Sequence, residues 1–175
     1  MIPRTALTLA AALASLPGVA TAQAVSENRV DVQTAWSVFV ETDPRECWVV
    51  SRPTKTVNTR GGQEVQVRRG EILLYVTFRP ESGVAGEVSF TGGYPFGPES
   101  KVRLQVGDNG FELPVDGEWA WPDSPGTDAR VVEALKAGTE AVLTGVSARG
   151  TTTRDTFSLL GISAALDEAQ KRCTN

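Results

Sequence analysis

The sequence contains no histidine among its 175 residues. Enzymes that use a Ser-His-Asp or Cys-His group need an imidazole, as do most zinc sites, so both classes are excluded. The two cysteines do not form a C-x-x-C motif, which excludes a thioredoxin-type redox centre. Glycine loops of the P-loop or Rossmann type, which bind phosphates, are also missing. We therefore expect a protein that is not an enzyme and that holds no metal and no cofactor.

Basic residues are fewer than acidic ones, 17 against 21, which gives a net charge of −4. They form no basic tract, so nucleic acid and anionic membranes are poor partners. Beyond the first residues, no apolar run is long enough to form a transmembrane helix. The expected partner is a protein or a component of the cell envelope, whose identity the composition does not reveal.

The N-terminus has the layout of a secretory signal peptide. Arg4 precedes an apolar run over residues 6–16, and Ala20–Ala22 is an A-x-A cleavage site before Gln23. The alternative is a membrane anchor, but the run is about half of the roughly 20 residues that span a bilayer. We predict a signal peptide over residues 1–22, cleaved near Ala22/Gln23, and a mature protein in the periplasm or secreted.

Residues 23–32 are polar and are predicted to be a flexible lead-in, followed by a single β domain over 33–175. Alternation of apolar and polar residues predicts about nine strands, at 36–41, 47–50, 72–78, 88–90, 102–106, 111–115, 118–121, 142–146 and 156–160. Residues 55–70 read as an exposed connection with one edge strand at 64–67. With helices over 125–137 and near the C-terminus, the prediction is a mainly β fold, an antiparallel β-sandwich or small barrel.

The C-terminal segment predicts an amphipathic helix that docks on the core. Gly161 ends the last strand, and Ser163 is a candidate N-cap. Gly138 is expected at the C′ position of the earlier helix. The apolar positions of the C-terminal helix recur every three or four residues; they are Ile162, Leu166, Ala169 and Cys173.

Cys47 and Cys173 are the two cysteines, and both remain after the predicted cleavage. Their patterns place both inside the core, one at the start of a short apolar strand and one on the helix stripe. An even pair in an oxidising compartment usually forms a disulfide. We therefore predict a Cys47–Cys173 bond; the alternative is two free buried thiols.

Carboxylates cluster near two tryptophans, Trp119 and Trp121. The acidic residues are Glu112, Asp116, Glu118 and Asp123. Glycosidases need two carboxyl groups about 5–10 Å apart, often with aromatic platforms, so a glycan-acting enzyme is the first alternative function. The simpler interpretation is a solvated hairpin surface with the tryptophans in the core. A secreted factor that binds a host surface is the second alternative.

Weaker binding candidates lie in the Gly- and Pro-rich loop at 92–98. Tyr94 and Phe96 are predicted to contact a partner, since aromatic residues anchor interfaces; alternatively, both rings fold back onto the open end of the sandwich. Arg68 and Arg69 either dock an acidic partner or are a solvated pair. Asp155 is expected to bind nearby backbone N–H groups.

Several of these features together resemble the invasion-associated locus B family of exported proteobacterial proteins. The similarity runs from about residue 33 to the end. It rests on Trp36 with Cys47, on Gly93-Tyr94-Pro95, on Ala134–Gly138, and on Gly150-Thr151-x-x-x-Asp155-Thr156-Phe157-Ser158-Leu159-x-Gly161-x-x-Ala164-Ala165 down to Cys173. Ile162 stands where a Phe is expected, a conservative change. The resemblance implies an exported envelope protein, with an invasion role named for pathogenic members, and it carries no catalytic residues. We predict a non-catalytic binding or envelope role for this protein.

Overall fold

A computed structural model describes residues 28–174, and antiparallel strands dominate this part of the chain. The strands are β1 (Arg29–Gln33), β2 (Trp36–Thr42), β3 (Arg45–Ser51), β4 (Lys55–Arg60), β5 (Gln63–Glu64), β6 (Leu73–Arg79), β7 (Val84–Thr91), β8 (Lys101–Val106), β9 (Asn109–Asp116), β10 (Trp119–Ala120), β11 (Glu140–Val146) and β12 (Thr152–Ser158). The helices are the short 3-10 helix η1 (Pro80–Ser82), α1 (Pro125–Ala137) and α2 (Ile162–Thr174). The predicted mainly β fold with two α-helices, the second at the C-terminus, is confirmed. The predicted signal peptide lies outside the described residues.

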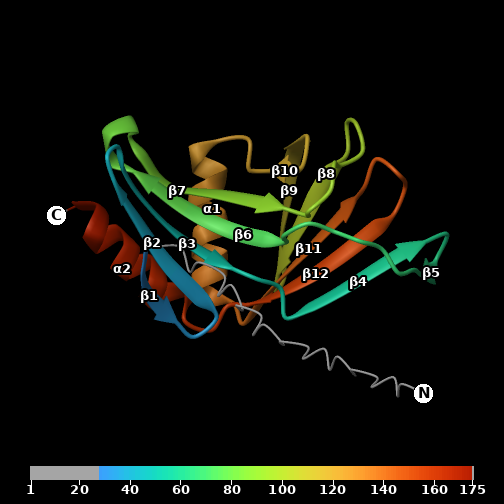
Figure 1. Ribbon diagram of the computed structural model, residues 1–175, viewed down its shortest axis with the longest axis horizontal. Coiled ribbons are helices and arrows are strands. Elements are labelled where there is room, and N and C mark those ends of the chain that lie inside the picture. The colour runs from blue at the N-terminus through green and yellow to red at the C-terminus, as the bar shows by residue number, and fades with distance from the viewer. Residues whose placement is uncertain (1–27, 175) are drawn as a thin grey trace, which may run out of the picture.

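The strands form one sheet in the order β1-β2-β3-β6-β7-β10-β9-β8-β11-β12-β4-β5. Its end strands, β1 and β5, do not pair with each other, so the sheet is open and is not the small barrel considered above. The sheet curves strongly (Figure 1), and its two halves meet in the interior. The ring centroids of Phe90 in β7 and Phe157 in β12 are 6.1 Å apart. The arrangement is compatible with the sandwich alternative.

One apolar core joins the sheet to both helices. Figure 1 shows α2 beside β1 and β2 and α1 behind β6 and β7. The contacts of α2 include β1 and β2, and α1 contacts β7. Trp36 and Val49 from the sheet, Leu135 from α1 and Leu166 from α2 are all buried in this core. Burial of a side chain of this size stabilises the fold by about 1.5–3 kcal/mol, so both helices are integral to the domain.

The C-terminal helix buries the predicted stripe, with Ile162, Leu166, Ala169 and Cys173 at most 4% exposed. The prediction that Ser163 caps this helix is wrong, because the helix already begins at Ile162. The turn before it depends on Gly161, whose φ is +90°. A Cβ at Gly161 would lie 2.2 Å from the Gln33 carbonyl oxygen, so the backbone approaches the β1–β2 turn too closely for any other residue.

The first α-helix begins and ends for local reasons. Ser124 is its N-cap and accepts a hydrogen bond from the Thr127 backbone N–H, and Pro125 occupies the first turn. The helix ends before Gly138 as predicted, but Gly138 has an extended backbone and not the left-handed conformation of a C′ glycine. A Cβ at Gly138 would lie 2.4 Å from Val106 Cγ1, so close packing explains the glycine.

Polar strands are where the sequence prediction was wrong. Residues 29–32 of the predicted flexible lead-in belong to β1, which pairs with β2. The predicted exposed connection at 55–70 contains β4, which pairs with β12, and the predicted edge strand at 64–67 is replaced by the short β5. These strands lie at the ends of the sheet and bury little apolar surface, so they lack the alternation that reveals central strands.

Candidate functional site

The Gly- and Pro-rich loop after β7 directs Tyr94 and Phe96 inward. Phe96 is 5% exposed and belongs to the core. Its ring centroid lies 4.9 Å from that of Tyr94. A Cβ at Gly145 would lie 2.8 Å from the Phe96 ring, so the glycine makes room for it. The prediction that Phe96 contacts a partner is therefore wrong, because its ring is buried, whereas Tyr94 is half-buried and lines a pocket.

The pocket has a volume of about 480 Å³ and lies among several loops and strand ends, a size typical of ligand sites of roughly 300–1,000 Å³. Its lining comes from the end of β4, the segment between β5 and β6, the loop after β7, the turn between β9 and β10, the loop after β11, and β12. The lining residues are Arg60, Gln66, Val67, Arg68, Arg69, Gly93, Tyr94, Pro95, Glu118, Ser147, Ala148, Arg149, Thr151 and Thr153. Segments far apart in the sequence thus build one concave site.

A buried ion pair holds one wall of the pocket. Arg69 donates from Nη1 to Asp155 Oδ1 at 2.8 Å and from Nη2 to Asp155 Oδ2 at 2.6 Å. Its Nε donates to the Gly92 carbonyl oxygen, and its guanidinium lies 5.1 Å from the centre of the Tyr94 ring. Burial raises the pKa of Asp155, and the paired guanidinium opposes that shift. This pair fixes the loop that carries Tyr94.

The ion pair corrects two predictions. Asp155 binds the side chain of Arg69, 86 residues away, and not nearby backbone N–H groups. Arg68 and Arg69 are neither a solvated pair nor a joint docking site, since Arg69 is buried while Arg68 is exposed at the pocket. Neighbours in the sequence therefore have different surroundings.

Hydroxyl groups line the floor of the pocket. Tyr94 Oη and Thr153 Oγ1 are hydrogen-bonded at 2.5 Å, and burial raises the pKa of the Tyr94 hydroxyl. Thr151 Oγ1 accepts a hydrogen bond from Arg60 Nη2 at 2.7 Å. Ser147 Oγ accepts one from the Thr151 backbone N–H at 3.1 Å. These hydroxyls are held in place by protein groups, and those of Thr151 and Ser147 keep their own O–H for donation.

Charge in the pocket is mainly positive. Among residues 28–174, four arginines line it, at positions 60, 68, 69 and 149, against the single carboxylate of Glu118. Asp155 neutralises Arg69. The other three arginines make no ion pair with any residue in the range 28–174. The site is suited to bind an acidic group.

Sequence reasoning missed Arg60, Arg149 and the two threonines, although a signal was present. Arginine precedes glycine at three positions, Arg60-Gly61, Arg69-Gly70 and Arg149-Gly150, and the first and third are turns. Arg60 ends β4, and Arg149 lies in the turn between β11 and β12. The fold brings both of them to the pocket together with Arg69.

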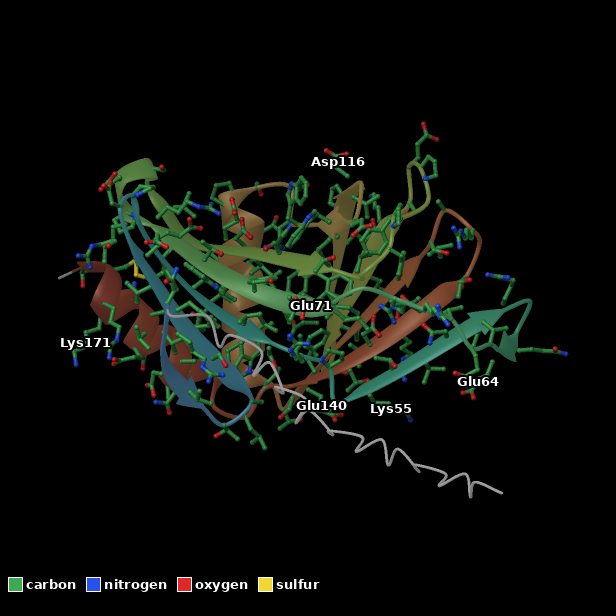
Figure 2. All side chains as sticks on the ribbon, viewed as in Figure 1. Lys55, Glu64, Glu71, Asp116, Glu140 and Lys171 are labelled. Atoms are coloured by element: carbon green, nitrogen blue, oxygen red, sulfur yellow. A yellow bond between two sulfur atoms is a disulfide. The ribbon has the colours of Figure 1, made fainter. Side chains whose placement is uncertain are left out.

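The acidic cluster near the tryptophans does not form a second site of this kind. Trp119 and Trp121 are 41% and 40% exposed, so neither lies in the core. Glu112 is paired with Lys101 at 2.7 Å, and the hydrogen bond from Lys101 lowers the pKa of Glu112. Only Glu118 of this cluster lines the pocket. Other acids, such as Asp116, project from the surface (Figure 2).

The disulfide joins two distant elements. Cys47 in β3 and Cys173 in α2 are bonded, with their Cα atoms 5.8 Å apart, and both are buried. Figure 2 shows the sulfur atoms beside α2. Arg45 Nη1 also donates to the Arg172 carbonyl oxygen at 2.7 Å. The C-terminal helix α2 is therefore covalently bonded to the β2–β3 hairpin, as the predicted pairing requires.

Two further features of the described residues concern metal binding and membrane insertion. In the described part of the chain, no group of three or more acidic or cysteine side chains is placed to hold a metal ion. Within the same residues, no helix has the length and apolar character needed to cross a membrane.

Comparison with known proteins places the chain in a family. The profile of the invasion associated locus B (IalB) protein family matches residues 36–170. The crystal structure of invasion associated protein B from Bartonella henselae superposes with a TM-score of 0.58 at 18% identity, covering 83% of this chain and 98% of that chain. No curated protein matches the sequence. The structural likeness shows the shared fold, and the profile match over most of the chain shows that this protein belongs to the IalB family.

Proposed function

We propose that this protein is an exported, non-catalytic binding protein of the bacterial cell envelope, and that it holds its ligand in the pocket around Tyr94. The observation that carries the proposal is the pocket itself, because a concave site of about 480 Å³ is lined by cationic and hydroxyl groups from five separate segments. A surface assembled from distant segments on a disulfide-linked scaffold is suited to binding.

The number and the pairing of the carboxylates favour a binding role over glycan hydrolysis. A glycosidase needs two carboxyl groups on either side of the sugar, and in the described part of the chain Glu118 is the one carboxylate that lines the pocket. Lys101 pairs with Glu112, which leaves that group less available as an acid or base. If Glu118→Gln abolished turnover of peptidoglycan or an oligosaccharide while the fold was retained, the non-catalytic role would be refuted.

Export is supported by the sequence of the first residues and by the disulfide. Arg4, the apolar run at 6–16 and the Ala20–Ala22 site have signal-peptide order. A buried disulfide is typical of oxidising compartments. We expect the protein in the periplasmic fraction, beginning at or near Gln23 by N-terminal sequencing. A protein that keeps Met1 in the cytoplasmic fraction would contradict export.

Binding at the pocket is tested by filling it. Ala148 is exposed and lines the pocket, so Ala148→Trp adds a large ring there without disturbing the core. Ala164 is exposed on α2 and not in the pocket lining, and Ala164→Trp is the matched control. Immobilised protein should capture an envelope component that mass spectrometry identifies, and only Ala148→Trp should lose it. Equal capture by both variants would place binding elsewhere.

A further inference from the structure

Three arginines at the pocket have no acidic partner within the described chain, although the chain as a whole is acidic. The net charge is −4, yet Arg60, Arg68 and Arg149 gather at one opening. We infer that the pocket binds an acidic segment of a peptide, with Arg68 and Arg149 pairing with its carboxylates. This inference rests on the proposed function and names the class of ligand.

Arg68 and Arg149 are the residues with unused hydrogen-bonding capacity. Both are exposed and line the pocket, and neither makes a side-chain hydrogen bond to residues 28–174. A guanidinium has five N–H donors and binds a carboxylate through two parallel hydrogen bonds. Arg60, by contrast, donates to Thr151 and is partly occupied. The acidic groups of the ligand are therefore assigned to Arg68 and Arg149.

The floor of the pocket offers hydrogen-bond donors to a ligand and few negatively charged groups. Thr151 Oγ1 accepts a hydrogen bond from Arg60, and Ser147 Oγ accepts one from the Thr151 backbone N–H. The hydroxyl hydrogens of Thr151 and Ser147 are therefore left to donate to a ligand. Of the residues that the structure describes, Glu118 is the only carboxylate in the lining. A carboxylate accepts hydrogen bonds and donates none, so it fits this lining, whereas an ammonium group does not.

The main chain beside the pocket favours a peptide over other acidic ligands. The segment between β5 and β6 is held at its two ends, by Val65 N–H to the Asn58 oxygen and by Gly70 N–H to the Gly93 oxygen. Between them, the backbone N–H and C=O groups of residues 66–68 have no hydrogen-bond partner among the residues that the structure describes. This segment directly follows β5, the strand at one end of the sheet, and unpaired backbone groups at a sheet edge pair with an extended peptide. An acidic sugar would use the arginines but has no matching series of amides.

The test uses acetylated, amidated tetraglutamate and tetraaspartate, with tetraglutamine as the neutral control, in isothermal titration calorimetry. We expect the acidic peptides to bind more tightly than tetraglutamine and to weaken as salt is raised, since exposed charge pairs are screened. Arg68→Gln and Arg149→Gln should each weaken binding roughly tenfold, the effect of losing one charge-assisted hydrogen bond.

Arg154→Gln is the matched control. Arg154 lies on β12 between Thr153 and Asp155, so the alternation of the strand directs it to the opposite face, and it is exposed. Arg154→Gln removes the same charge from outside the pocket lining and should change the affinity less than about twofold. If Arg154→Gln weakened binding as much as Arg68→Gln, the attraction would be a general charge effect and the assigned site would be wrong.

Trigalacturonate and inorganic phosphate complete the experiment. Tighter binding of trigalacturonate would replace the peptide by an acidic glycan, and phosphate binding as tight as tetraglutamate would show a simple anion site; either result overturns the inference. If neither acidic peptide bound, but Ala148→Trp still lost capture of an envelope component, the acidic-peptide inference would be refuted. The proposed function would then stand. Failure of both experiments would refute both.

Discussion

At the scale of single residues, the pocket depends on the buried pair of Arg69 and Asp155. The side chains are 7% and 0% exposed, and Arg69 also binds the loop that carries Tyr94. A charge without its partner in such a place is strongly unfavourable, although the pair itself need not stabilise the fold more than apolar residues would.

Arg69→Met should therefore lower the free energy of unfolding by about 3–5 kcal/mol, because Asp155 is left buried without a partner. The double variant Arg69→Met/Asp155→Leu should be less destabilised than Arg69→Met alone. Urea unfolding followed by circular dichroism measures both. A single variant as stable as the parent protein would show that the pair has no structural role.

Substitutions of the two aromatic residues of the 92–98 loop should lower the stability by different amounts, because the two rings differ in burial. Phe96→Ala leaves a cavity in the core and should cost about 3–5 kcal/mol. Tyr94→Phe removes only the hydroxyl that bonds Thr153, and should cost about 1 kcal/mol. Thermal unfolding of the two variants tests this order. Similar losses from both would contradict the different surroundings of the rings.

At the scale of elements, the junctions of α2 determine how the C-terminus packs. The helix covers β1, β2, β3 and β6, and its position is set by the tight turn at Gly161 and by the disulfide to β3. The turn and the bond act at opposite ends of the same helix, so each can be removed separately.

Gly161→Ala should destabilise the protein by more than about 2 kcal/mol. The new Cβ would clash with the backbone of Gln33, and alanine is strained at the positive φ of this position. Gly107→Ala is the control, because Gly107 also has a positive φ, +54°, but no atom within 4 Å of its Cβ position. It should cost only about 1 kcal/mol for the backbone conformation. If denaturant unfolding gave equal losses of stability for the two variants, the close approach of Gly161 to Gln33 would not be the reason for the glycine.

At the scale of the whole molecule, the disulfide closes a loop of most of the domain. The two cysteines are 126 residues apart, and a loop of this length stabilises the folded state by about 4–5 kcal/mol in the chain-entropy treatment. The same bond joins the N-terminal hairpin to the last helix, so it holds the two ends of the domain together.

Replacing both cysteines by alanine should lower the free energy of unfolding by about 2–5 kcal/mol. The loss should be near the lower value if the buried stripe of α2 and the Arg45 contact to Arg172 hold the helix alone. Urea unfolding with and without reductant measures it, and peptide mapping under non-reducing conditions verifies the bond. Two free thiols in the oxidised protein would contradict the pairing.

Strand prediction from the sequence worked where one face of a strand is buried. Residues 36–41 and 102–106 alternate between core and solvent, and both are strands in the structure. The method failed at β1 and β4, whose sequences are mostly polar. Pairing with a neighbouring strand stabilises them through backbone hydrogen bonds, which are independent of the side-chain pattern.

The sequence by itself determined the compact β domain with a C-terminal helix, the pairing of two cysteines and membership of the IalB family. The fold class follows from local periodicity and the pairing from the presence of only two cysteines, whereas the family follows from the match of residues 36–170 to the family profile. Only the tertiary structure decided that Phe96 is core, that Arg69 pairs with Asp155, and that Arg60, Arg68 and Arg149 share one pocket. The reason is physical, because burial and ion pairing depend on which distant segments meet, and sheet order is not encoded in the alternation of any one strand.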